Sequence, residues 1–293
     1  MKTISRYAPI IFVALWSTGF VGAKYIIPYA EPFVFLTLRY AFATVILVLL
    51  AKILREPLRI SRTDIFQSIK VGLFLQVTYI GGVFYSVSHG VSAGVTAVIV
   101  SMQPIFVSII GVRMLNEPLT LRNIFGLLIG FLGVFILLNP KIIEGTIDFQ
   151  FSTAGMTASL IALIGTTAGY LLQKRGGAEI PFLPGTAVQF STATISFLIA
   201  TFFFEQWNVQ VNLQFIAALS WFVLALSIGS IFLLFFLLRN ESASSVSSLY
   251  YLVPPLTALQ AYILFGEKIP PVGFVGLFMA VLGTLLVTYK KAN

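Results

Sequence analysis

Two stretches of this sequence carry the same pattern of residues at a constant separation of 150 positions. Residues 91–138 align with residues 241–288 without a gap, and small residues, prolines and glutamates coincide. The matched pairs are Ser92 and Ser242, Ala93 and Ala243, Pro104 and Pro254, Glu117 and Glu267, Gly126 and Gly276, and Gly133 and Gly283. The same separation pairs Gly19, Phe20 and Lys24 with Gly169, Tyr170 and Lys174. The chain is therefore predicted to consist of two homologous halves, residues 1–140 and 151–293.

The composition places both halves in a membrane. Hydrophobic residues make up 58% of the chain and charged residues only 10%, whereas a soluble protein carries about 25% charged residues. The apolar runs are about 20 residues long, which matches a hydrocarbon core about 30 Å thick. We predict an all-α integral membrane protein with ten transmembrane helices, at residues 7–28, 32–54, 64–88, 91–114, 119–138, 151–173, 181–204, 211–238, 242–265 and 270–289.

Five predicted spans in each half, an odd number, give the two halves opposite orientations in the membrane. The only long connections are predicted at residues 55–63 and 139–150, and the second begins with the turn signal Asn139–Pro140. Inverted repeats of this kind enclose a site near the bilayer midplane, and each half forms part of one gate. The repeat therefore predicts a secondary transporter that works by alternating access around a central cavity.

Basic residues fall mainly in the loops on one side of the predicted spans. These residues are Lys2, Arg6, Lys52, Arg55, Arg59, Arg62, Arg113, Arg122, Lys174, Arg175, Arg239, Lys290 and Lys291, and the other side carries only Lys141 and Lys268. Because cytoplasmic loops are enriched in Lys and Arg, we predict that both termini are cytoplasmic. The chain is then a multi-pass protein of the bacterial cytoplasmic (inner) membrane. Residues 8–23 are interpreted as a retained helix, because no signal-peptide cleavage pattern follows them.

Composition and motifs exclude several other function classes. The chain has no cysteine and a single histidine, His89, so thiolate and multi-histidine metal sites are excluded. No H-E-x-x-H, G-x-S-x-G or G-x-x-x-x-G-K-[ST] motif occurs, so neither an enzyme nor a bound metal or cofactor is expected. The net charge of +8 comes from short loops between apolar segments, which indicates membrane topology rather than binding of nucleic acid.

Small residues recur at helical spacing in the last predicted span of each half. They are Gly126, Gly130 and Gly133 in the first half, and Gly276, Ala280 and Gly283 in the second. Small residues allow helix backbones to approach closely in lipid, where burial of apolar surface does not drive association. We therefore expect these two helices to pack against each other or against a neighbouring copy of the chain. A monomer and a homodimer both remain possible.

Taken together, these motifs resemble those of the drug/metabolite transporter superfamily. They are Trp16–Ser17 followed by Lys24, Arg39–Tyr40, and the string from Pro104 to Gly133 with its copy from Pro254 to Gly283. The resemblance covers essentially the whole chain and points to the ten-span EamA-type metabolite exporters. That group includes exporters of amino acids, among them an aromatic amino-acid exporter type.

This resemblance implies a central cavity lined by helices 1, 3, 4, 6, 8 and 9, with helices 5 and 10 at the periphery. The second half departs from the first at two positions of the motif. Gln189 stands where the first half has Arg39, and Thr166 stands where it has Trp16. The two halves of the site are therefore expected to differ in chemistry.

Charged residues inside a membrane are costly and indicate function. Lys24 is predicted either to reach the outer interface or to hold a substrate carboxylate or close a gate. Arg39 lies about 10 Å into its helix, which favours a buried structural or gating role. All ten carboxylates map to loops or helix ends, and only His89 remains as a proton carrier. We therefore predict uniport or exchange, with proton-driven export of other metabolites or drugs as the alternative.

Polar and aromatic side chains near the midplane complete the candidate site. Prolines in helices 4 and 9, at Pro104 and Pro254–Pro255, weaken the two helices at equivalent places, which indicates a binding site. The candidate substrate-binding residues are Trp16, Ser17, Phe20, Lys24, Arg39, Gln76, Tyr79, Tyr85, Ser101, Gln103, Thr167, Tyr170, Ser245, Ser248 and Tyr251. Helix packing by Ser and Thr and interfacial anchoring by Tyr are the alternative roles.

The predicted lining is aromatic and rich in hydroxyl groups, and it carries no negative charge. Such a lining suits a zwitterion with an apolar side chain, or a mono-anion, better than a polycation. Amino acids are therefore the leading class of small-molecule substrate. Membrane lipid is the other expected partner, and nucleic acid is not.

Overall fold

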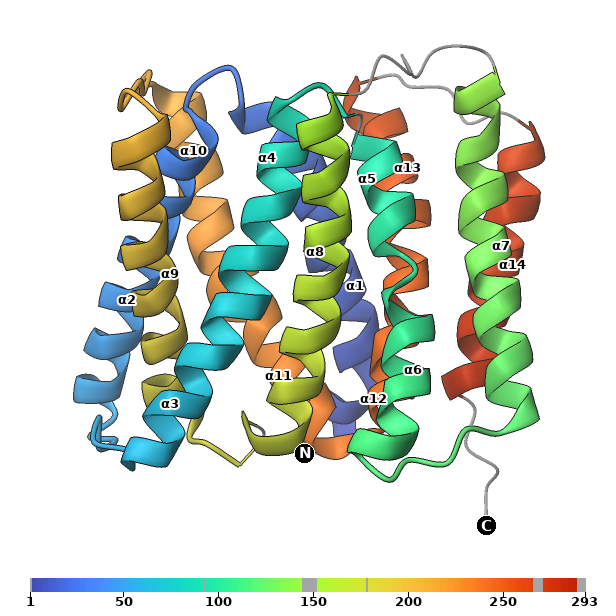
Figure 1. Cartoon of the computed structure of the whole chain (residues 1–293), viewed down its shortest axis with the longest axis horizontal. Coiled ribbons are helices and arrows are strands. Elements are labelled where there is room, and N and C mark those ends of the chain that lie inside the picture. The colour runs from blue at the N-terminus through green and yellow to red at the C-terminus, as the bar shows by residue number, and fades with distance from the viewer. Residues whose placement is uncertain (1, 92, 144–151, 178, 266–270, 289–293) are drawn as a thin grey trace.

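The computed structural model describes residues 2–91, 93–143, 152–177, 179–265 and 271–288. Nearly all of these residues are helical, and the helices lie side by side between two ends of one bundle (Figure 1). The N-terminus lies at the same end of the bundle as the described end of the last helix. The predicted all-helical membrane fold is therefore confirmed for the described part of the chain.

The helical rods of the first half run in alternating directions along the bundle, and some rods contain two or more successive helices (Figure 1). In chain order they are α1 (Lys2–Ile26), α2 (Pro32–Ile53), α3 (Arg62–Val71), η1 (Gly72–Gly81), α4 (Gly82–Ser88), α5 (Ala93–Val100), α6 (Gln103–Met114) and α7 (Leu121–Ile143). The segment η1 is π-helical and joins α3 to α4 in one continuous rod.

The second half repeats this order. Its elements are α8 (Thr153–Leu172), η2 (Gln173–Gly177), α9 (Phe182–Phe204), α10 (Leu213–Trp221), η3 (Phe222–Ser230), α11 (Ile231–Asn240), α12 (Ala243–Ser248), η4 (Leu249–Leu252), α13 (Val253–Phe265) and α14 (Pro271–Thr288). The segments η2 and η3 are π-helical, and η4 is a 3₁₀ turn.

Six of the described helical rods are long and apolar enough to cross a membrane, judged by length and composition. They are Pro32–Ile53, Arg62–Ser88, Thr153–Gly177, Phe182–Phe204, Leu213–Asn240 and Pro271–Thr288. Shorter apolar helices lie before the first of these rods, at Tyr7–Ala23, and between the second and the third, at Gln103–Met114 and Leu121–Leu137. The predicted total of ten spans stays a prediction.

The connection predicted at residues 139–150 is wrong in its first part. Helix α7 continues through Asn139 and Pro140 and ends at Ile143, and residues 144–150 lie outside the described part. A proline removes one backbone donor. Near the end of a long apolar helix, this single loss does not terminate the helix, so the turn signal misplaced the boundary by a few residues.

The predicted weakening of helices 4 and 9 by proline is confirmed. Between α5 and α6 the helix is interrupted at Ser101 and Met102, directly before Gln103–Pro104. Between α12 and α13 the backbone tightens into η4, directly before Pro254. Proline has no backbone N–H to continue the helical hydrogen bonding of the preceding turn, so both helices change geometry at equivalent positions.

Helices α7 and α14 lie side by side (Figure 1) and pack through the predicted glycines. A methyl group on Gly133 would lie 2.7 Å from the carbonyl oxygen of Gly276, and one on Gly276 would lie 2.5 Å from that of Gly133. A methyl group on Gly126 would lie 2.8 Å from the carbonyl oxygen of Gly283. The contact is therefore reciprocal. The two helices pack against each other, which was one of the two arrangements predicted from the sequence. The glycines form this contact.

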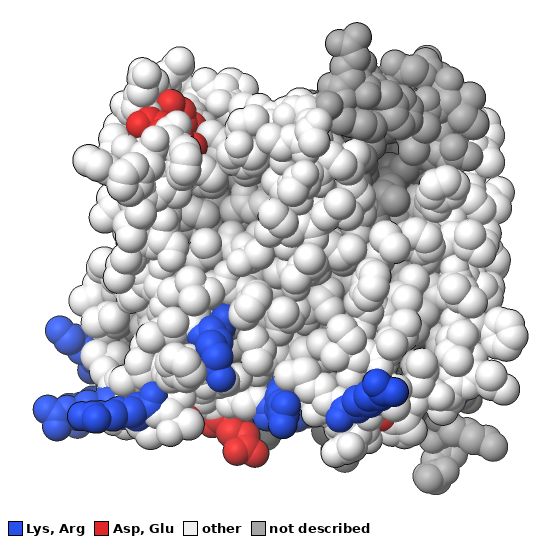
Figure 2. Space-filling view, viewed as in Figure 1, with Lys and Arg blue, Asp and Glu red and all other residues white. Residues whose placement is uncertain are grey.

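The two ends of the bundle differ in charge (Figure 2). Lys and Arg side chains line the end at which α2, α6 and α11 finish and α3 begins. We name this end the basic end. At the opposite end, Figure 2 shows acidic side chains clustered near the start of α2, where Glu31 and Glu205 lie.

A larger side chain in the glycine contact is expected to separate α7 from α14. We predict that Gly133→Leu lowers the thermal unfolding midpoint in detergent, because overpacking costs about 1–3 kcal/mol and the neighbouring atoms are backbone atoms that cannot rotate away. The matched control is Val281→Leu, on the exposed face of α14, which should leave the midpoint unchanged. Equal midpoints for the two variants would contradict this account of the contact.

Candidate functional site

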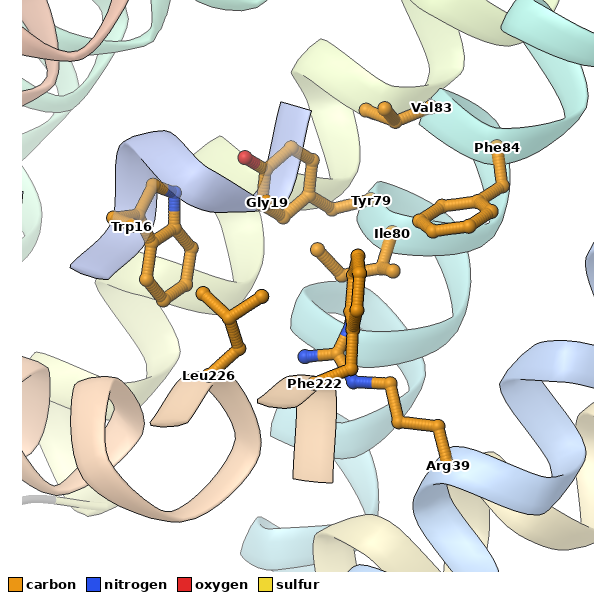
Figure 3. A pocket seen from close by; sticks show the side chains of 9 residues that line it. All are labelled: Trp16, Gly19, Arg39, Tyr79, Ile80, Val83, Phe84, Phe222 and Leu226. Carbon is orange, nitrogen blue, oxygen red and sulfur yellow. The ribbon is translucent and has the colours of Figure 1, made fainter. Parts of the chain in front are cut away.

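A small cavity of about 40 Å³ lies among helices of both halves (Figure 3). Its wall consists of one charged side chain, aromatic rings and aliphatic groups. The lining residues are Trp16 and Gly19 of α1, Arg39 of α2, Tyr79 and Ile80 of η1, Val83 and Phe84 of α4, and Phe222 and Leu226 of η3. Three predicted substrate-binding residues, from three different helices, therefore meet at one cavity.

Arg39 is the charged residue of this wall. Its side chain is only 6% exposed, and its Nε donates a hydrogen bond of 2.8 Å to Ser227 Oγ on η3. The guanidinium carbon lies 5.0 Å from the ring centre of Tyr40 and 5.1 Å from that of Phe222. Such cation–π contacts stabilise a charge by about 0.5–2 kcal/mol each. Aromatic rings, rather than a carboxylate, surround this charge in the described structure.

An aromatic wall extends from the cavity toward the second half. It consists of Phe12, Trp16, Tyr250 and Tyr170. The ring of Trp16 lies 5.2 Å from that of Phe12 and 5.6 Å from that of Tyr250, and Tyr250 lies 6.3 Å from Tyr170. The wall therefore joins α1 to η4 and α8.

Two π-helical segments flank Arg39. They are η1 and η3, which begin at Gly72 and Phe222, again 150 positions apart. The first supplies Tyr79 to the cavity, and the second supplies Phe222 and Leu226. Wide π turns occur frequently at functional sites. The resemblance implied that helix 8 lines the cavity, but the sequence analysis named no lining residue in η3, because a π turn has no composition signature; the repeat alone relates η3 to η1.

Several buried polar atoms near the midplane have no hydrogen-bond partner among the described residues. They include both amide atoms of Gln103, Nε2 of Gln76, Oγ1 of Thr166 and the hydroxyl of Tyr250. Leaving a buried polar group unpaired costs about 1–3 kcal/mol. Buried polar groups in native proteins normally have a partner, so these atoms are ready to bind water or a polar ligand.

Other predicted site residues adjoin the cavity without lining it. Gln76 Oε1 accepts a hydrogen bond of 2.9 Å from the Tyr40 hydroxyl, next to Arg39. The Tyr170 ring belongs to the aromatic wall. Ser17 Oγ accepts a hydrogen bond of 2.8 Å from Gln260 Nε2, which ties α1 to α13. The side chains of Phe20 and Lys24 lie outside the described part of the structure.

The structure places three aromatic or hydroxyl candidates away from the cavity. Tyr85 stacks on His89 with 3.8 Å between ring centres and borders a groove on the side of the bundle. Thr167 donates a hydrogen bond to Leu163 in its own helix and borders a second, apolar groove. Tyr251 packs against Gly130 of α7. The cavity does not include these residues, and binding of substrate by them stays a prediction.

The serine candidates lie along broken helices. Ser245 donates its backbone N–H to Ser242 Oγ in the first turn of α12, at the basic end. Ser248 donates to the carbonyl of Ser245, and its own carbonyl accepts from Thr284. Ser101 is buried at the interruption between α5 and α6. None of these three serines lines the described cavity, and binding of substrate by them stays a prediction.

Contacts at the basic end hold the start of α12 against its neighbours. We name this set the basic-end clamp. Both carboxylate oxygens of Glu117 accept from the Ala243 backbone N–H, at 3.0 and 2.9 Å. Lys174 Nζ donates to the carbonyl oxygens of Leu238 and Glu241. The Tyr170 hydroxyl reaches the Ala243 carbonyl at 3.4 Å, and Ser108 and Ser244 share a hydrogen bond of 2.8 Å. The clamp thus joins α6, α8, α11 and α12.

Acidic residues hold the opposite end together. Glu205, just beyond α9, accepts hydrogen bonds of 2.8 and 2.7 Å from the backbone N–H groups of Phe33 and Val34 in the first turn of α2. Burial raises the pKa of Glu205 above its ordinary value, and these two N–H groups oppose the rise. Glu31 accepts from the backbone N–H groups of Gln206 and Asn208 in return. Each carboxylate therefore satisfies backbone donors of the other segment.

Because the pKa of Glu205 is raised in the folded state, its ionisation opposes folding. The stabilising effect of the protonated form is complete below the ordinary value of 4.5 and is lost as the pH rises through the raised pKa. We therefore predict that, as the pH rises from 4 to 8, the unfolding midpoint of the wild type decreases relative to that of Glu205→Gln. The control is Glu56→Gln, in the exposed loop after α2. A pH-independent difference for Glu205→Gln would contradict the prediction.

Long apolar helices around a buried, charged cavity are features of a helical membrane transporter. Comparison with known sequences places the chain more narrowly. It belongs to the EamA-like transporter family, whose sequence profile matches two stretches, residues 7–139 and 153–289. Members of this family are transporters, so the chain is a transporter and not an enzyme.

Individual relatives are distant but extend over most of the chain. It is 25% identical over 295 residues to the uncharacterized transporter YvbV of Bacillus subtilis, across 99% of this chain and 93% of YvbV. It is 23% identical over 216 residues to a probable terminal-alkyne amino-acid exporter of Streptantibioticus cattleyicolor, across 68% of this chain and 65% of that protein. A solved crystal structure superposes with a TM-score of 0.78 at 17% identity, across 96% and 95% of the two chains, and so shares the fold.

Proposed function

We propose that this protein is a secondary carrier that exports small polar metabolites, most specifically amino acids, across the bacterial cytoplasmic membrane. The observation that carries this proposal is the cavity at Arg39. A buried cation lies there beside aromatic rings that extend into both halves. A zwitterion with an apolar side chain presents both a carboxylate and a hydrophobic surface, and it fits this combination.

The proposed mechanism is alternating access of two inverted halves. The reciprocal glycine contact supports it. Gly126 contacts Gly283, and Gly133 contacts Gly276. The repeat relates Gly126 to Gly276 and Gly133 to Gly283, so it exchanges the two contacts. Two antiparallel helices related by a two-fold axis in the membrane plane make such a contact. The α7–α14 pair then serves as a fixed support, and the other helices of the two halves rock about the central cavity.

The proposed orientation places the basic end in the cytoplasm, since Lys and Arg are retained on that side of a membrane. The basic-end clamp then closes the cytoplasmic gate. Carboxylates of the described residues lie at helix ends or in loops, which favours uniport or exchange over proton-driven export. The carrier binds its small-molecule substrate while surrounded by lipid, as a monomer or a homodimer, and does not bind nucleic acid.

One family relative supports amino acids as cargo. The Streptantibioticus protein is named a probable terminal-alkyne amino-acid exporter. A terminal-alkyne amino acid combines a carboxylate with an apolar side chain, the two features that the cavity matches. The aromatic wall extends this match toward bulky apolar side chains. We therefore choose phenylalanine as the test substrate.

Counterflow tests the proposed function directly. Proteoliposomes preloaded with unlabelled phenylalanine should accumulate labelled phenylalanine transiently and saturably, because exchange through one site does not need an external energy source. Threonine and an organic cation serve as parallel substrates. Accumulation of the cation alone, or none for either amino acid, would contradict the assignment of amino acids as the substrate class.

The basic-end clamp gives a second, independent test. We expect Lys174→Gln to open the cytoplasmic end about fivefold more often, since a hydrogen bond from a charged donor at a half-buried site contributes about 1 kcal/mol. The chain has no cysteine, so Ser247→Cys, at a buried position of α12, provides a single labelling site. Maleimide should modify it about fivefold faster from the basic side in the Lys174→Gln background.

The control for this experiment is Arg175→Gln. Arg175 is the next residue in the chain and is exposed at the same end, so its loss should leave the labelling rate unchanged. Equal rates in the Lys174→Gln background and in the parent would show that the clamp does not close this end.

A further inference from the structure

The guanidinium of Arg39 is buried, and no described carboxylate forms an ion pair with it. Among the described residues it makes a hydrogen bond from Nε to Ser227 and two contacts with aromatic rings. Nε donates one of the five N–H bonds of the group, so the others have no partner within the part of the chain that the structure describes.

This arrangement is costly unless a ligand completes it. Taking a charge out of water costs several kcal/mol even after the protein relaxes. Two cation–π contacts recover only part of that cost. A negatively charged group at the guanidinium would recover much of the rest, because a charge-assisted hydrogen bond is roughly twice as strong as a neutral one.

The cavity beside Arg39 has the size of such a group. Its volume of about 40 Å³ accommodates a single carboxylate or a halide ion. Apolar groups form most of the wall, including Ile80, Val83 and Leu226. Figure 3 shows the guanidinium directed between the two π-helical segments toward this space. Such a dry wall strengthens the attraction between the guanidinium and a negative group.

The neighbouring polar groups also suit an anion. The Gln76 carbonyl oxygen is already occupied by the Tyr40 hydroxyl, whereas its Nε2 donor has no partner in the described structure. The side chain of Gln76, which contacts the neighbour of Arg39, therefore keeps one N–H donor without a described partner. An unpaired donor beside a cation favours a negatively charged ligand over a neutral one.

Only one of the two repeat-related positions can form this site. The repeat counterpart of Arg39 is Gln189, whose amide donates to Gln173 at 3.2 Å, and the counterpart of Ser227 is Val77. The repeat-related position therefore lacks both members of the Arg39–Ser227 pair. Among the described residues, the site occurs once.

We propose that the cavity at Arg39 is an anion-binding site for a single monovalent group. Its ligand is a carboxylate or an inorganic monoanion such as chloride. The existence of the site depends on the geometry alone. Its assignment to the substrate carboxylate rests on the proposed function, in which the amino acid enters with its carboxylate at Arg39 and its side chain along the aromatic wall.

Binding to the purified protein in detergent tests the site without requiring transport. The protein is prepared in a chloride-free sulfate buffer, which contains no carboxylate, and titrated with L-phenylalanine, phenylalaninamide and chloride, with the unfolding midpoint and tryptophan fluorescence as readouts. We expect phenylalanine to bind and phenylalaninamide, which lacks the carboxylate, to bind at least tenfold more weakly. Chloride should compete with phenylalanine. The fluorescence change should disappear in Trp16→Phe, because Trp16 lines the cavity.

Variants at position 39 identify the binding group. Arg39→Gln reproduces the residue of the second half and should weaken binding of phenylalanine and chloride at least tenfold, whereas Arg39→Lys should retain part of it. Lys70→Gln removes a positive charge that lies over the Phe66 ring, outside the cavity, and should bind like the wild type. If Arg39→Gln does not elute as a folded protein, the comparison of phenylalanine with phenylalaninamide on the wild type still tests whether binding requires the carboxylate.

The outcomes separate the two sources of the anion. Binding of phenylalanine in competition with chloride supports the site and its assignment to substrate. Binding of chloride alone supports the site and assigns it to an inorganic ion. Wild-type affinity in folded Arg39→Gln, or no binding of either ligand, overturns the proposal. Counterflow in proteoliposomes remains a separate measurement, so a failed carrier assignment is distinguishable from a failed anion site.

Discussion

Hydrogen bonding of the backbone in lipid is the constraint on which this structure depends. Without water, each backbone N–H and C=O needs a partner within the protein, so irregular backbone is tolerated only where it is buried or lines a cavity. The chain obeys this at η1, η3 and η4 and at the interruption before α6. These four departures from α-helix belong to rods with buried residues. The same restriction therefore determines where a polar site can form.

Close backbone contact holds α7 and α14 together. Glycines bring the two helices so close that no side chain separates their backbones. This pair contributes nothing to the described lining of the cavity. The rods around the cavity combine hydrogen bonds and aromatic contacts with close glycine contacts of their own, since Gly72 of η1 meets the backbone of Gln189 and Gly169 of α8 meets that of Leu75. The α7–α14 support and the cavity therefore lie in different parts of the bundle.

Features encoded by residue type could be predicted from the sequence, and features that depend on rotation about a helix axis could not. The glycine contact and the proline interruptions follow from small residues and from a missing N–H. By contrast, adjacent residues of a helix point about 100° apart. Tyr250 therefore meets Trp16 while Tyr251 meets Gly130. An error of one position in the predicted register, or a π turn that adds one residue, moves a side chain from the cavity lining into a packing contact. Arg39 was identified because a charge in a span is conspicuous in any register.

The π-helical segments have a consequence for how such a bundle can change shape. A π turn encloses one more residue than an α turn. When the additional residue of the π turn shifts from one turn to the next, the side chains between the two positions rotate about the helix axis. Both ends of the rod stay in place meanwhile. With one surplus residue in η1 and another in η3, on either side of Arg39, the interior can be rearranged by local twisting. The outer contour of the protein in the bilayer then needs little adjustment.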